Sequence, residues 1–563
     1  MKETRLQERD FAMWKRRGSY KNVEEYLTAR TGCSLAELKN PSSVPASSIQ
    51  NLQNAANLIF QVAHTEEDAK IVIVGDYDVD GITSTAMLTM LLNYLWITPA
   101  AIIPRRFTDG YGINDSMIEN IHDSLIITVD NGITAHDVVE HAKRNGNRFI
   151  ILDHHLASDV LPEPDVLVDP HIEPEKNGFV DYCAAGLVLK LAELMVKDEV
   201  TGEAKKLMTN LRVLACLGTI ADVMPLVGDN RRIVIDGLNL INGVEYHYLN
   251  AGIRAILRVQ EERCDEETIK FKTAPILNAP GRLYDKGSKS TLKAILCQDE
   301  AMAAGFAEKM FAINEERKEL VKKWAQIADE QLGEDFNESA IILCFEELPE
   351  GLAGILAGRL SKEYRKVAFV FSGTKDEGIL KASGRSYGDF DISGLLAAVK
   401  DDAVKAGGHA GAAGISIEKS KFDLIKAKML AYMDANWVEQ DDAVYYDCVI
   451  TEKQVADVLE TLKEYAPFGE GIERPVFHVK AFHAISKRGS SYYMLMGQDK
   501  NHIRLTGQYV DAVGFFKADE YEDLGNPDTV DLIADVTENV FRGHASPQLS
   551  IIEIGEPTLE PLG

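Results

Sequence analysis

Several features that define common protein classes are missing from this 563-residue sequence. The seven cysteines are scattered and form no CxxC pair, which argues against a zinc ribbon or a disulfide framework and favours a reducing cytoplasm. No run of about 18 apolar residues occurs, so we expect no membrane span. The first residues, MKETRLQERDF, are too charged for the apolar core of a signal peptide. There is no GxxxxGK[ST] phosphate loop, which disfavours an ATP-driven motor.

Positive charge is also in short supply. The chain has 60 Lys and Arg residues against 88 Asp and Glu residues, a net charge of −28. Such a charge disfavours a protein that coats nucleic acid non-specifically, but it allows one that binds a polyanion through metal ions and a few local arginines. At about 100–200 residues per domain, the length predicts three or four domains.

Short apolar runs alternate with helical patterns in the first half of the chain. The runs KIVIV, AAII, LIITV and FIIL indicate strands that are buried on both faces. Helical patterns at 83–95 and 135–145 separate them. Strand and helix in alternation predict a parallel sheet of the doubly wound type. The four strands are expected at 70–74, 100–103, 125–129 and 149–152.

The second half contains another α/β region and then an all-β region. The runs at 340–345 and 367–371 indicate strands, with a helix at 352–360 between them. Residues 301–332 predict a long helix that either connects two domains or lies in a core. From about residue 445, short runs separated by turn residues predict a small barrel. The expected domains are a helical segment at 1–50, the first α/β domain at 51–225, a helical region with the connecting helix at 226–333, the second α/β domain at 334–435 and the barrel at 445–563.

The strongest local signal is the segment VGDYDVDGITS, which follows the first strand directly. Asp76, Asp78 and Asp80 occupy every second position. Closely spaced carboxylates repel one another, so they need a cation between them to remain ionised together. The alternative is a turn that caps the next helix, with Gly81 and Thr83 as turn and N-cap residues. Three aspartates in five residues exceed what a cap requires, and we therefore favour a metal site.

Further candidate ligands follow the other strands. Asp130 ends LIITV, and Asp153, His154 and His155 end FIIL, so parallel strands would bring them to the same sheet edge. Asp222 ends an apolar helix in LGTIADVMPL, where it is either another ligand or a cap. Either Asp130 or the histidines alone could be structural, but together these ligand types suit a pair of Mn²⁺ or Mg²⁺ ions. Two such ions about 3.5–4 Å apart can activate water and hold a phosphoryl group.

These motifs resemble a known superfamily. GDYDVDG, VDNG, DHH and GTIADVMPL, in this order, are similar to the DHH phosphoesterases. LNAPGR, AGRL, ASGRS and GGHAGAAG resemble the RecJ branch, whose members are single-strand-specific exonucleases that degrade DNA from 5′ to 3′. PFGEGIERPVF resembles that branch's motif before its oligonucleotide-binding (OB) barrel. The similarity extends from about residue 45 to the end of the chain.

The resemblance assigns roles to residues of this sequence. Asp78 and Asp130 would bind one metal ion, and Asp80, Asp130, His154 and Asp222 the second, with Asp130 as the bridge. Some relatives have a histidine where this chain has Val74, so Asp76 would complete the first site. His155 would act beside the scissile phosphate as a donor or proton shuttle, unless it only orients its neighbours. Asp153 would hold the histidines in place.

Other residues would contact the substrate. We expect Arg282 in a proline-containing turn with its guanidinium exposed. The resemblance implies that it clamps a phosphate. Together with Asp130 and His155 it would be one of the catalytic residues. Arg106 would contact the sugar-phosphate backbone of the DNA. A pocket for the terminal 5′-phosphate would contain Ser383, Arg385, Gly407, Gly408 and His409.

In the barrel, six aromatic residues alternate with basic ones, and we expect only one or two of the six to stack on DNA bases. They are Phe477, Tyr492, Tyr493, Phe515, Phe516 and Phe541. The chain departs from the RecJ pattern at Glu347–Gly351, where relatives have Trp-His, and at Gly471-Ile472, where they have Gly-Asn. The first departure puts one substrate contact in question.

The resemblance implies a metal-dependent 5′ to 3′ exonuclease of single-stranded DNA, acting in recombination and repair through water activated by two metal ions. It also implies a cytoplasmic monomer without membrane association and, as partners, a helicase and a single-strand-binding protein. One alternative is a relative that cleaves oligoribonucleotides or cyclic dinucleotides; such relatives commonly lack the barrel. The other is a non-catalytic replication scaffold, which would have lost metal ligands that are present here.

Overall fold

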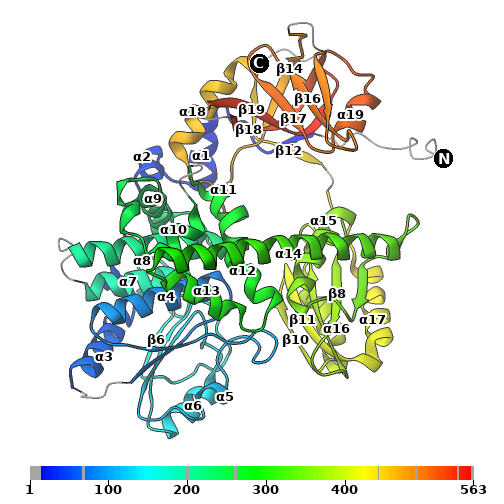
Figure 1. Ribbon diagram of the computed structural model, residues 1–563. Helices are drawn as coiled ribbons and strands as arrows, with labels where there is room; N and C mark the ends of the chain where they lie inside the picture. The colour runs from blue at the N-terminus through cyan, green and yellow to red at the C-terminus, as the bar shows by residue number, and fades with distance from the viewer. Residues whose placement is uncertain are drawn as a thin grey trace. The chain divides into compact units, whose positions relative to one another are not determined.

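The computed structural model describes residues 14–65, 70–196, 202–258, 263–441, 443–487, 491–541 and 544–558. The chain forms two compact units (Figure 1). The larger unit comprises residues 43–224 and 228–440. The smaller unit comprises the described parts of 1–42, 225–227 and 441–563. Among the described residues, no helix has both the length and the apolar character needed to cross a bilayer.

The larger unit begins with a five-stranded sheet in the order β3-β2-β4-β5-β6, and all of its pairings are parallel. Its central strands, β2 and β4, are buried along their whole length, as continuous runs of Val, Ile and Leu require when helices cover both faces. The predicted doubly wound sheet is confirmed. The strands are β2 (Ile71–Val74), β3 (Ala100–Ile102), β4 (Leu125–Val129), β5 (Arg148–Leu152) and β6 (Val166–Val168), joined in part by α4 (Val79–Tyr94) and α6 (His136–Arg144).

Helices surround this sheet and continue beyond it. They include α3 (Leu52–Thr65), α7 (Ala184–Met195), α8 (Gly202–Ala221), α9 (Gly228–Asn242), α10 (Ala251–Leu257), α12 (Ala274–Leu283) and α13 (Gly287–Leu296). A buried polar cluster joins α7 to α9. The ammonium of Lys190 lies 2.7 Å from the Asp229 carboxylate, which also accepts hydrogen bonds from the Tyr182 hydroxyl and the Val44 amide.

Helix α14 (Glu300–Leu332) is the predicted long helix, and it both connects two domains and contributes to a core. Its first half packs against α10 and α12, whereas Trp324, Ala325 and Ala328 belong to the core of the second α/β domain. That domain has a five-stranded sheet in the order β10-β11-β9-β8-β7. The sheet carries α15 (Ala353–Tyr364) on one face and α16 (Ser393–Val399) and α17 (Phe422–Asn436) on the other. Its strands are β7 (Ile341–Phe345), β8 (Ala368–Gly373), β9 (Ile379–Arg385), β10 (Lys405–His409) and β11 (Ala412–Glu418).

The smaller unit contains a seven-stranded mixed sheet in the order β13-β14-β18-β19-β17-β16-β15. Helices α1 (Val23–Thr31) and α18 (Val455–Tyr465) pack side chains into its core, so the N-terminal segment belongs with the barrel. The domain boundaries given above otherwise remain predictions. The strands are β13 (Cys448–Ile450), β14 (Phe477–His483), β15 (Tyr493–Met496), β16 (His502–Thr506), β17 (Asp511–Gly514), β18 (Thr529–Phe541) and β19 (His544–Gly555).

The barrel aromatics divide into core and surface residues. Phe477 is fully buried, and Tyr492 and Tyr493 pack against the core. Phe515 and Phe516 are 61% and 71% exposed, and both rings lie edge-on to His502. The side chain of Phe541 lies outside the described residues. Among the aromatic side chains of this set that the structure describes, Phe515 and Phe516 are therefore the two that are exposed enough to stack on a base.

The buried cluster leads to a prediction about stability. Lys190→Met should lower the free energy of unfolding by roughly 3–5 kcal/mol, because it leaves the Asp229 carboxylate buried without its cation. Urea denaturation followed by circular dichroism would measure the change. Lys176→Met, which breaks an exposed pair with Glu173, is the matched control and should change the midpoint little. Equal midpoints for Lys190→Met and the wild type would contradict the prediction.

Candidate metal centre

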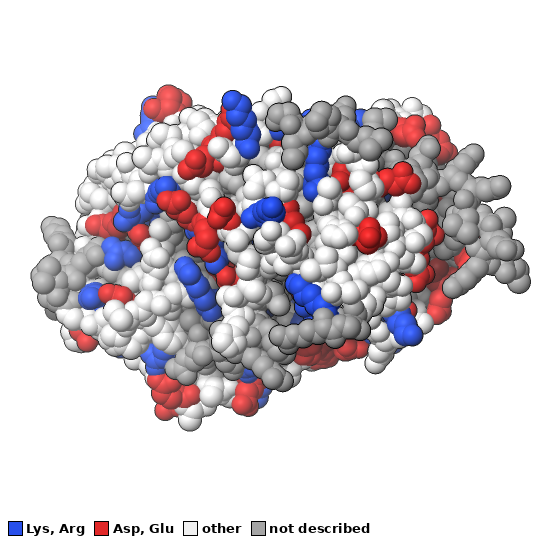
Figure 2. Space-filling model, turned by 90° about the horizontal axis from the view of Figure 1, so that it is seen from above, with Lys and Arg blue, Asp and Glu red and all other residues white. Residues whose placement is uncertain are grey.

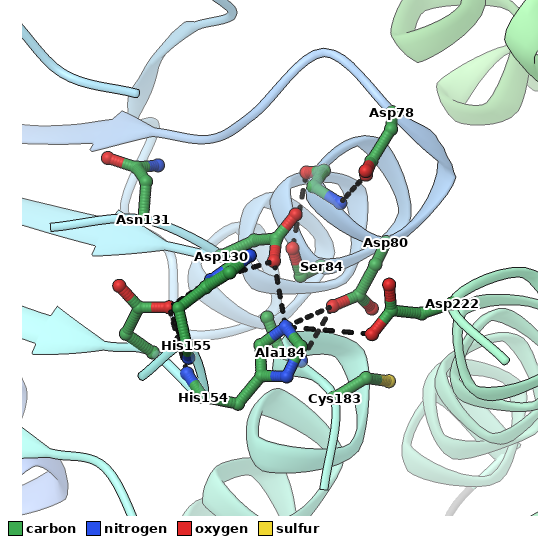
Figure 3. A network of polar contacts seen from close by, with 12 residues as sticks. Asp78, Asp80, Ser84, Asp130, Asn131, His154, His155, Cys183, Ala184 and Asp222 are labelled. Atoms are coloured by element: carbon green, nitrogen blue, oxygen red, sulfur yellow. Dashed lines mark hydrogen bonds and ion pairs between the residues drawn. The ribbon is translucent and has the colours of Figure 1, made fainter. Parts of the chain in front are cut away.

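The carboxyl ends of three neighbouring strands define the site. Asp76 follows β2, Asp130 follows β4 directly, and Asp153 and His154 follow β5. Because β2, β4 and β5 are adjacent and parallel, these ends lie at one edge of the sheet, where ligands bind in open α/β folds. Asp222 arrives from the end of α8, and Figure 3 shows its carboxylate facing the imidazole of His154.

The first group of ligand atoms belongs to Asp76, Asp78 and Asp130, which offer oxygens within 4.8 Å of one another. Asp78 caps helix α4 by accepting a hydrogen bond from the Gly81 amide, so an aspartate of this segment does cap the helix. The N-cap predicted at Thr83 was wrong, because the helix begins at Val79 and both Gly81 and Thr83 lie inside it. Asp76 has no such structural role. Neither of its buried carboxylate oxygens accepts a hydrogen bond of normal geometry from any described residue. Burial, followed by the charge of Asp78, raises the pKa of Asp76 to about 8.

The second group comprises Asp80, His154 and Asp222. The Nε2 atom of His154 lies 3.8 Å from Asp80 Oδ2 and 3.7 Å from Asp222 Oδ2 (Figure 3). Burial, followed by the negative charge of Asp80, raises the pKa of Asp222 to about 8. Burial also lowers the pKa of His154, so its imidazole is held neutral, the form that binds a metal ion.

Backbone groups hold Asp80 in place. The Ala184 and Ala185 amides at the N-terminus of α7 donate hydrogen bonds of 2.7 and 2.9 Å to its two carboxylate oxygens. The positive end of that helix adds a favourable electrostatic interaction. On the opposite side, a Cβ atom at Gly218 would lie only 2.7 Å from Asp80 Oδ1, so α8 can approach closely only with glycine there.

Asp130 belongs to both groups of ligands. Its Oδ1 atom is 3.1 Å from His154 Nε2, and its carboxylate also faces Asp76 and Asp78. The residue has φ +64°, a left-handed conformation that is strained for a side chain other than glycine and is found at functional sites. Burial, followed by Asp78, raises its pKa well above the ordinary value. Five carboxylates, three of them fully buried, therefore lie in one pocket and favour a shared cation.

His155 lies at the margin of the cluster and is held by Asp153. The Asp153 carboxylate is 2.8 Å from His155 Nδ1 and also accepts the Ile133 amide. Burial opposes the charge on His155, but Asp153 outweighs it and raises the pKa to about 9. His155 is consequently a cation at neutral pH. The Tyr111 hydroxyl lies 3.0 Å from its Nε2 atom.

A cluster of arginines lies beside the acidic groups. The guanidinium of Arg106 stacks 3.7 Å from the ring centre of Tyr77, which stands between Asp76 and Asp78. Burial, then the charges of Arg106 and Arg317, with a smaller contribution from Arg385, lower the pKa of Arg282 to about 10. Three other guanidinium groups thus lie close enough to Arg282 to repel it, an arrangement that would suit an anion. We name Arg106, Arg282, Arg317 and Arg385 the arginine cluster.

The local structure predicted for Arg282 was wrong. The residue lies in the last turn of α12, with Pro280 inside the helix, and its side chain is half-buried rather than exposed on a turn. Its guanidinium donates to the Gly351 carbonyl at 3.2 Å. Pro280 removes one backbone hydrogen bond, to the Ile276 carbonyl, and the helix ends three residues later at Leu283.

Four of the five residues predicted for the 5′-phosphate pocket lie on the same face of the second sheet. Ser383 and Arg385 alternate along β9 on the side that α15 covers. Gly407 pairs across β11 with Ser383, and His409 with Arg385, so these four residues occupy the same face. Gly414 and Ala412, on the strand between them, have small side chains. The two outer strands, β10 and β9, are therefore separated by a shallow surface about 10 Å wide, which is two strand spacings. Gly408 belongs to the row of Gly384, on the other face.

Two residues of the site were not identified from the sequence. Tyr111 lies in the loop after β3, where its position at the ligand edge of the sheet was the available signal. Arg317 lies on α14 among exposed charges, and its surrounding sequence carries no signal. Its Nε donates to the buried Asn314 at 3.0 Å, and burial lowers its pKa.

Comparisons with known proteins agree with this arrangement. The chain matches the DHH family N-terminal domain at 70–219, the DHHA1 domain at 337–435 and the RecJ OB domain at 446–553. It is 30% identical to the single-stranded-DNA-specific exonuclease RecJ of Dickeya dadantii, over 86% of this chain and 87% of the relative. The chain belongs to the RecJ family.

Other RecJ proteins are similar over most of their length. The RecJ of Salmonella typhimurium is 29% identical over 91% of both chains. That of Bacillus subtilis is 28% identical over 89% of this chain, which spans only 63% of that relative. The structure of RecJ from Thermus thermophilus in complex with Mn²⁺ has the same fold, with a TM-score of 0.80 at 24% identity over 98% of this chain and 80% of that one. A manganese-bound exonuclease RecJ is 27% identical over 69% of this chain and 96% of its own, with a TM-score of 0.58.

The pKa values predict how pH and metal ions affect stability. In EDTA, the free energy of unfolding should fall as pH rises from about 4 to about 8. Asp76 and Asp222 keep their protons up to about pH 8 when folded but ionise near pH 3.9 when unfolded, so the folded state binds more protons in this range. The stability is therefore fully present below the unfolded pKa and is lost as pH rises through the folded pKa.

Added MnCl₂ should raise the melting temperature more at about pH 8 than at about pH 6, because binding must displace those protons. Asp76→Asn should flatten the pH dependence in EDTA. Asp123→Asn is the matched control, since Asp123 lies at the opposite end of β4 and also has a positive φ. Equal manganese shifts at both pH values would contradict this account.

Proposed function

We propose that this chain is a metal-dependent exonuclease that hydrolyses single-stranded DNA from its 5′ end, in recombination and repair. The observation that carries the proposal is the position of Asp130 between two groups of carboxylate and imidazole ligands, with the arginine cluster beside them. The two groups of ligands that share Asp130 would form a site for two cations, and the arginine cluster would form a site for phosphate groups. Membership of the RecJ family supports the same reaction.

The donor atoms fit divalent cations. Asp76, Asp78 and Asp130 would hold one Mn²⁺ or Mg²⁺ ion, and Asp80, Asp130, His154 and Asp222 the other. The partnerless oxygens of Asp76 and the raised pKa values of Asp130 and Asp222 support this assignment. When bound, such ions polarise the phosphoryl group and provide an activated water at neutral pH.

His155 and Arg282 would act on the phosphate from the protein side. His155 is protonated at neutral pH and held by Asp153, so it can donate a hydrogen bond or a proton to the reacting phosphate. Arg282 is fixed by the Gly351 carbonyl and would balance the charge that develops on the phosphoryl oxygens. Both are preorganised, which reduces the reorganisation needed during the reaction.

The charge distribution supports binding along a restricted path. The net charge is −28, and on the face shown in Figure 2 Lys and Arg are scattered among Asp and Glu instead of forming one patch. Residues 443–558, which include the barrel, contain 19 acidic and 10 Lys or Arg residues. We infer that stacking on Phe515 and Phe516 contributes more to the barrel's affinity for a strand than its overall charge. Phosphate contacts would concentrate at the arginine cluster.

Resemblance to RecJ supports three further features of the proposal. The protein would act in the cytoplasm, as a monomer, and together with a helicase and a single-strand-binding protein. The reaction itself is tested by digesting 5′- and 3′-labelled single strands, duplexes and dinucleotides with Mn²⁺, Mg²⁺ or EDTA. Release of label first from 5′-labelled single strands is expected, whereas preferential cleavage of dinucleotides would contradict the proposal.

Asp130→Asn should reduce hydrolysis by at least about a hundredfold, because even the loss of a residue that only supports a ligand costs 10–100-fold. Asparagine tolerates the left-handed backbone at this position, so the fold should be retained. Initial rates with saturating Mn²⁺, together with a thermal melt, would measure both effects. Asp123→Asn again serves as the control, and wild-type turnover by Asp130→Asn would exclude the bridging role.

Arg385→Ala should slow cleavage of 5′-phosphorylated strands more than that of 5′-hydroxyl strands. Charge-assisted contacts to phosphate contribute about 1.5–3 kcal/mol, so the ratio of the two rates should fall roughly ten- to a hundredfold. Lys362→Ala removes an exposed cation of the same domain, on α15, and should leave the ratio unchanged. If Arg385→Ala lowers both rates equally, the terminal phosphate must bind elsewhere.

A further inference from the structure

Asp285 lies in the turn between α12 and α13, and its carboxylate contacts two segments that are distant in the sequence. It accepts a hydrogen bond of 3.1 Å from the Phe107 amide and one of 2.6 Å from the Thr108 hydroxyl. It also lies 2.9 Å from the ammonium of Lys375, which in turn donates to Thr108 Oγ1 at 2.5 Å. One carboxylate thereby joins the loop after β3, the end of α12 and the turn between β8 and β9.

Each of the three segments carries a member of the arginine cluster. Arg106 precedes Phe107 in the loop, and Arg282 lies three residues before Asp285 on α12. The turn that contains Lys375 leads into β9, which ends at Arg385. The arginines repel one another, so their spacing has to be fixed by groups outside the phosphate site. Asp285 links all three segments, because it accepts the Phe107 backbone amide directly and reaches the turn before β9 through Lys375.

An ordinary role as a turn residue does not explain these contacts. The described hydrogen bonds of the Asp285 side chain all go to other segments, and Lys286 instead holds the N-cap position of α13. Burial opposes its ionisation, but Thr108 and Lys375 outweigh burial and lower the pKa of Asp285. Its negative charge is thus present throughout the neutral range.

A separate contact fixes the metal-binding loop. The Ser288 hydroxyl donates to the Tyr77 carbonyl at 2.7 Å, between Asp76 and Asp78. Loss of the Asp285 charge leaves this bond and all metal-ligand candidates in place. The arginine cluster and the metal centre can therefore be disturbed independently.

We propose that Asp285 is a positioning residue that sets the positions of Arg106 and Arg385 relative to Arg282, which the Gly351 carbonyl holds, and so determines how tightly the DNA strand binds before cleavage. The inference rests on the proposed function, because it assumes that the arginine cluster holds phosphates. It assigns Asp285 no part in bond cleavage. Lys375 extends the same arrangement to the second α/β domain.

Asp285→Asn tests the proposal in the full-length protein. Its affinity for 5′-phosphorylated oligothymidylate in EDTA should fall about tenfold, and KM should rise by a similar factor, while kcat and the manganese dependence change less than about threefold. Asp285→Glu, which keeps the charge, should recover part of the affinity. Glu346→Gln is the matched control, because it removes an exposed lysine-paired carboxylate elsewhere in the same unit. Thermal melts establish that each variant is folded.

A double-mutant cycle separates positioning from a general structural effect. If Asp285 acts through Arg106, adding Asp285→Asn to Arg106→Ala should weaken binding much less than it does in the wild type. Additive losses, a fall in kcat at unchanged KM, or wild-type affinity in folded Asp285→Asn would each overturn the inference. A wild-type protein that neither binds nor cleaves single strands would instead refute the proposed function.

Discussion

Carboxylates that lie a few ångströms apart in a largely buried pocket repel one another, and the first α/β domain has to hold them there against that repulsion. An uncompensated buried charge costs several kcal/mol, so these side chains persist only where other groups hold them. The α7 amides bind Asp80, and the Asp130 backbone adopts a left-handed conformation. Rigid backbone thus holds the acidic groups at the positions where a cation can neutralise them.

The arginine cluster presents the same problem with the opposite sign. Guanidinium groups from four segments converge beside the carboxylates, and burial, followed by the charges of its neighbours, lowers the pKa of Arg282. A phosphodiester backbone supplies the missing negative charge, as metal ions supply the missing positive charge. This pairing of two unbalanced half-sites explains how a protein of net charge −28 can select a polyanionic substrate. It also confines that selection to one place on the molecule.

The parts of the structure that follow from local patterns could be predicted from the sequence. The runs IVIV and LIITV require burial on both faces, and their parallel arrangement places Asp76 and Asp130 at one edge. Arg317 could not be found in this way, because its role depends on which face of a 33-residue helix meets the cluster. The same limit applies to Arg282, where packing at the end of α12 overrides the turn preference of Pro280. Tertiary contacts decide such cases, and single-sequence patterns do not contain them.

Helix α14 has one further consequence. Its 33 residues span about 50 Å at 1.5 Å per residue. One end packs on α10 and α12, and the other end belongs to the core of the second α/β domain. A helix anchored at both ends cannot stretch, so it holds the sheet of the second α/β domain, with the proposed terminal-phosphate pocket, at a fixed distance from the proposed metal centre. A strand held in the proposed pocket by its terminal phosphate would then reach the metal centre at a fixed number of nucleotides from that phosphate. The size of each released fragment would be set by the protein's own dimensions and would not vary with the bases that pass through it.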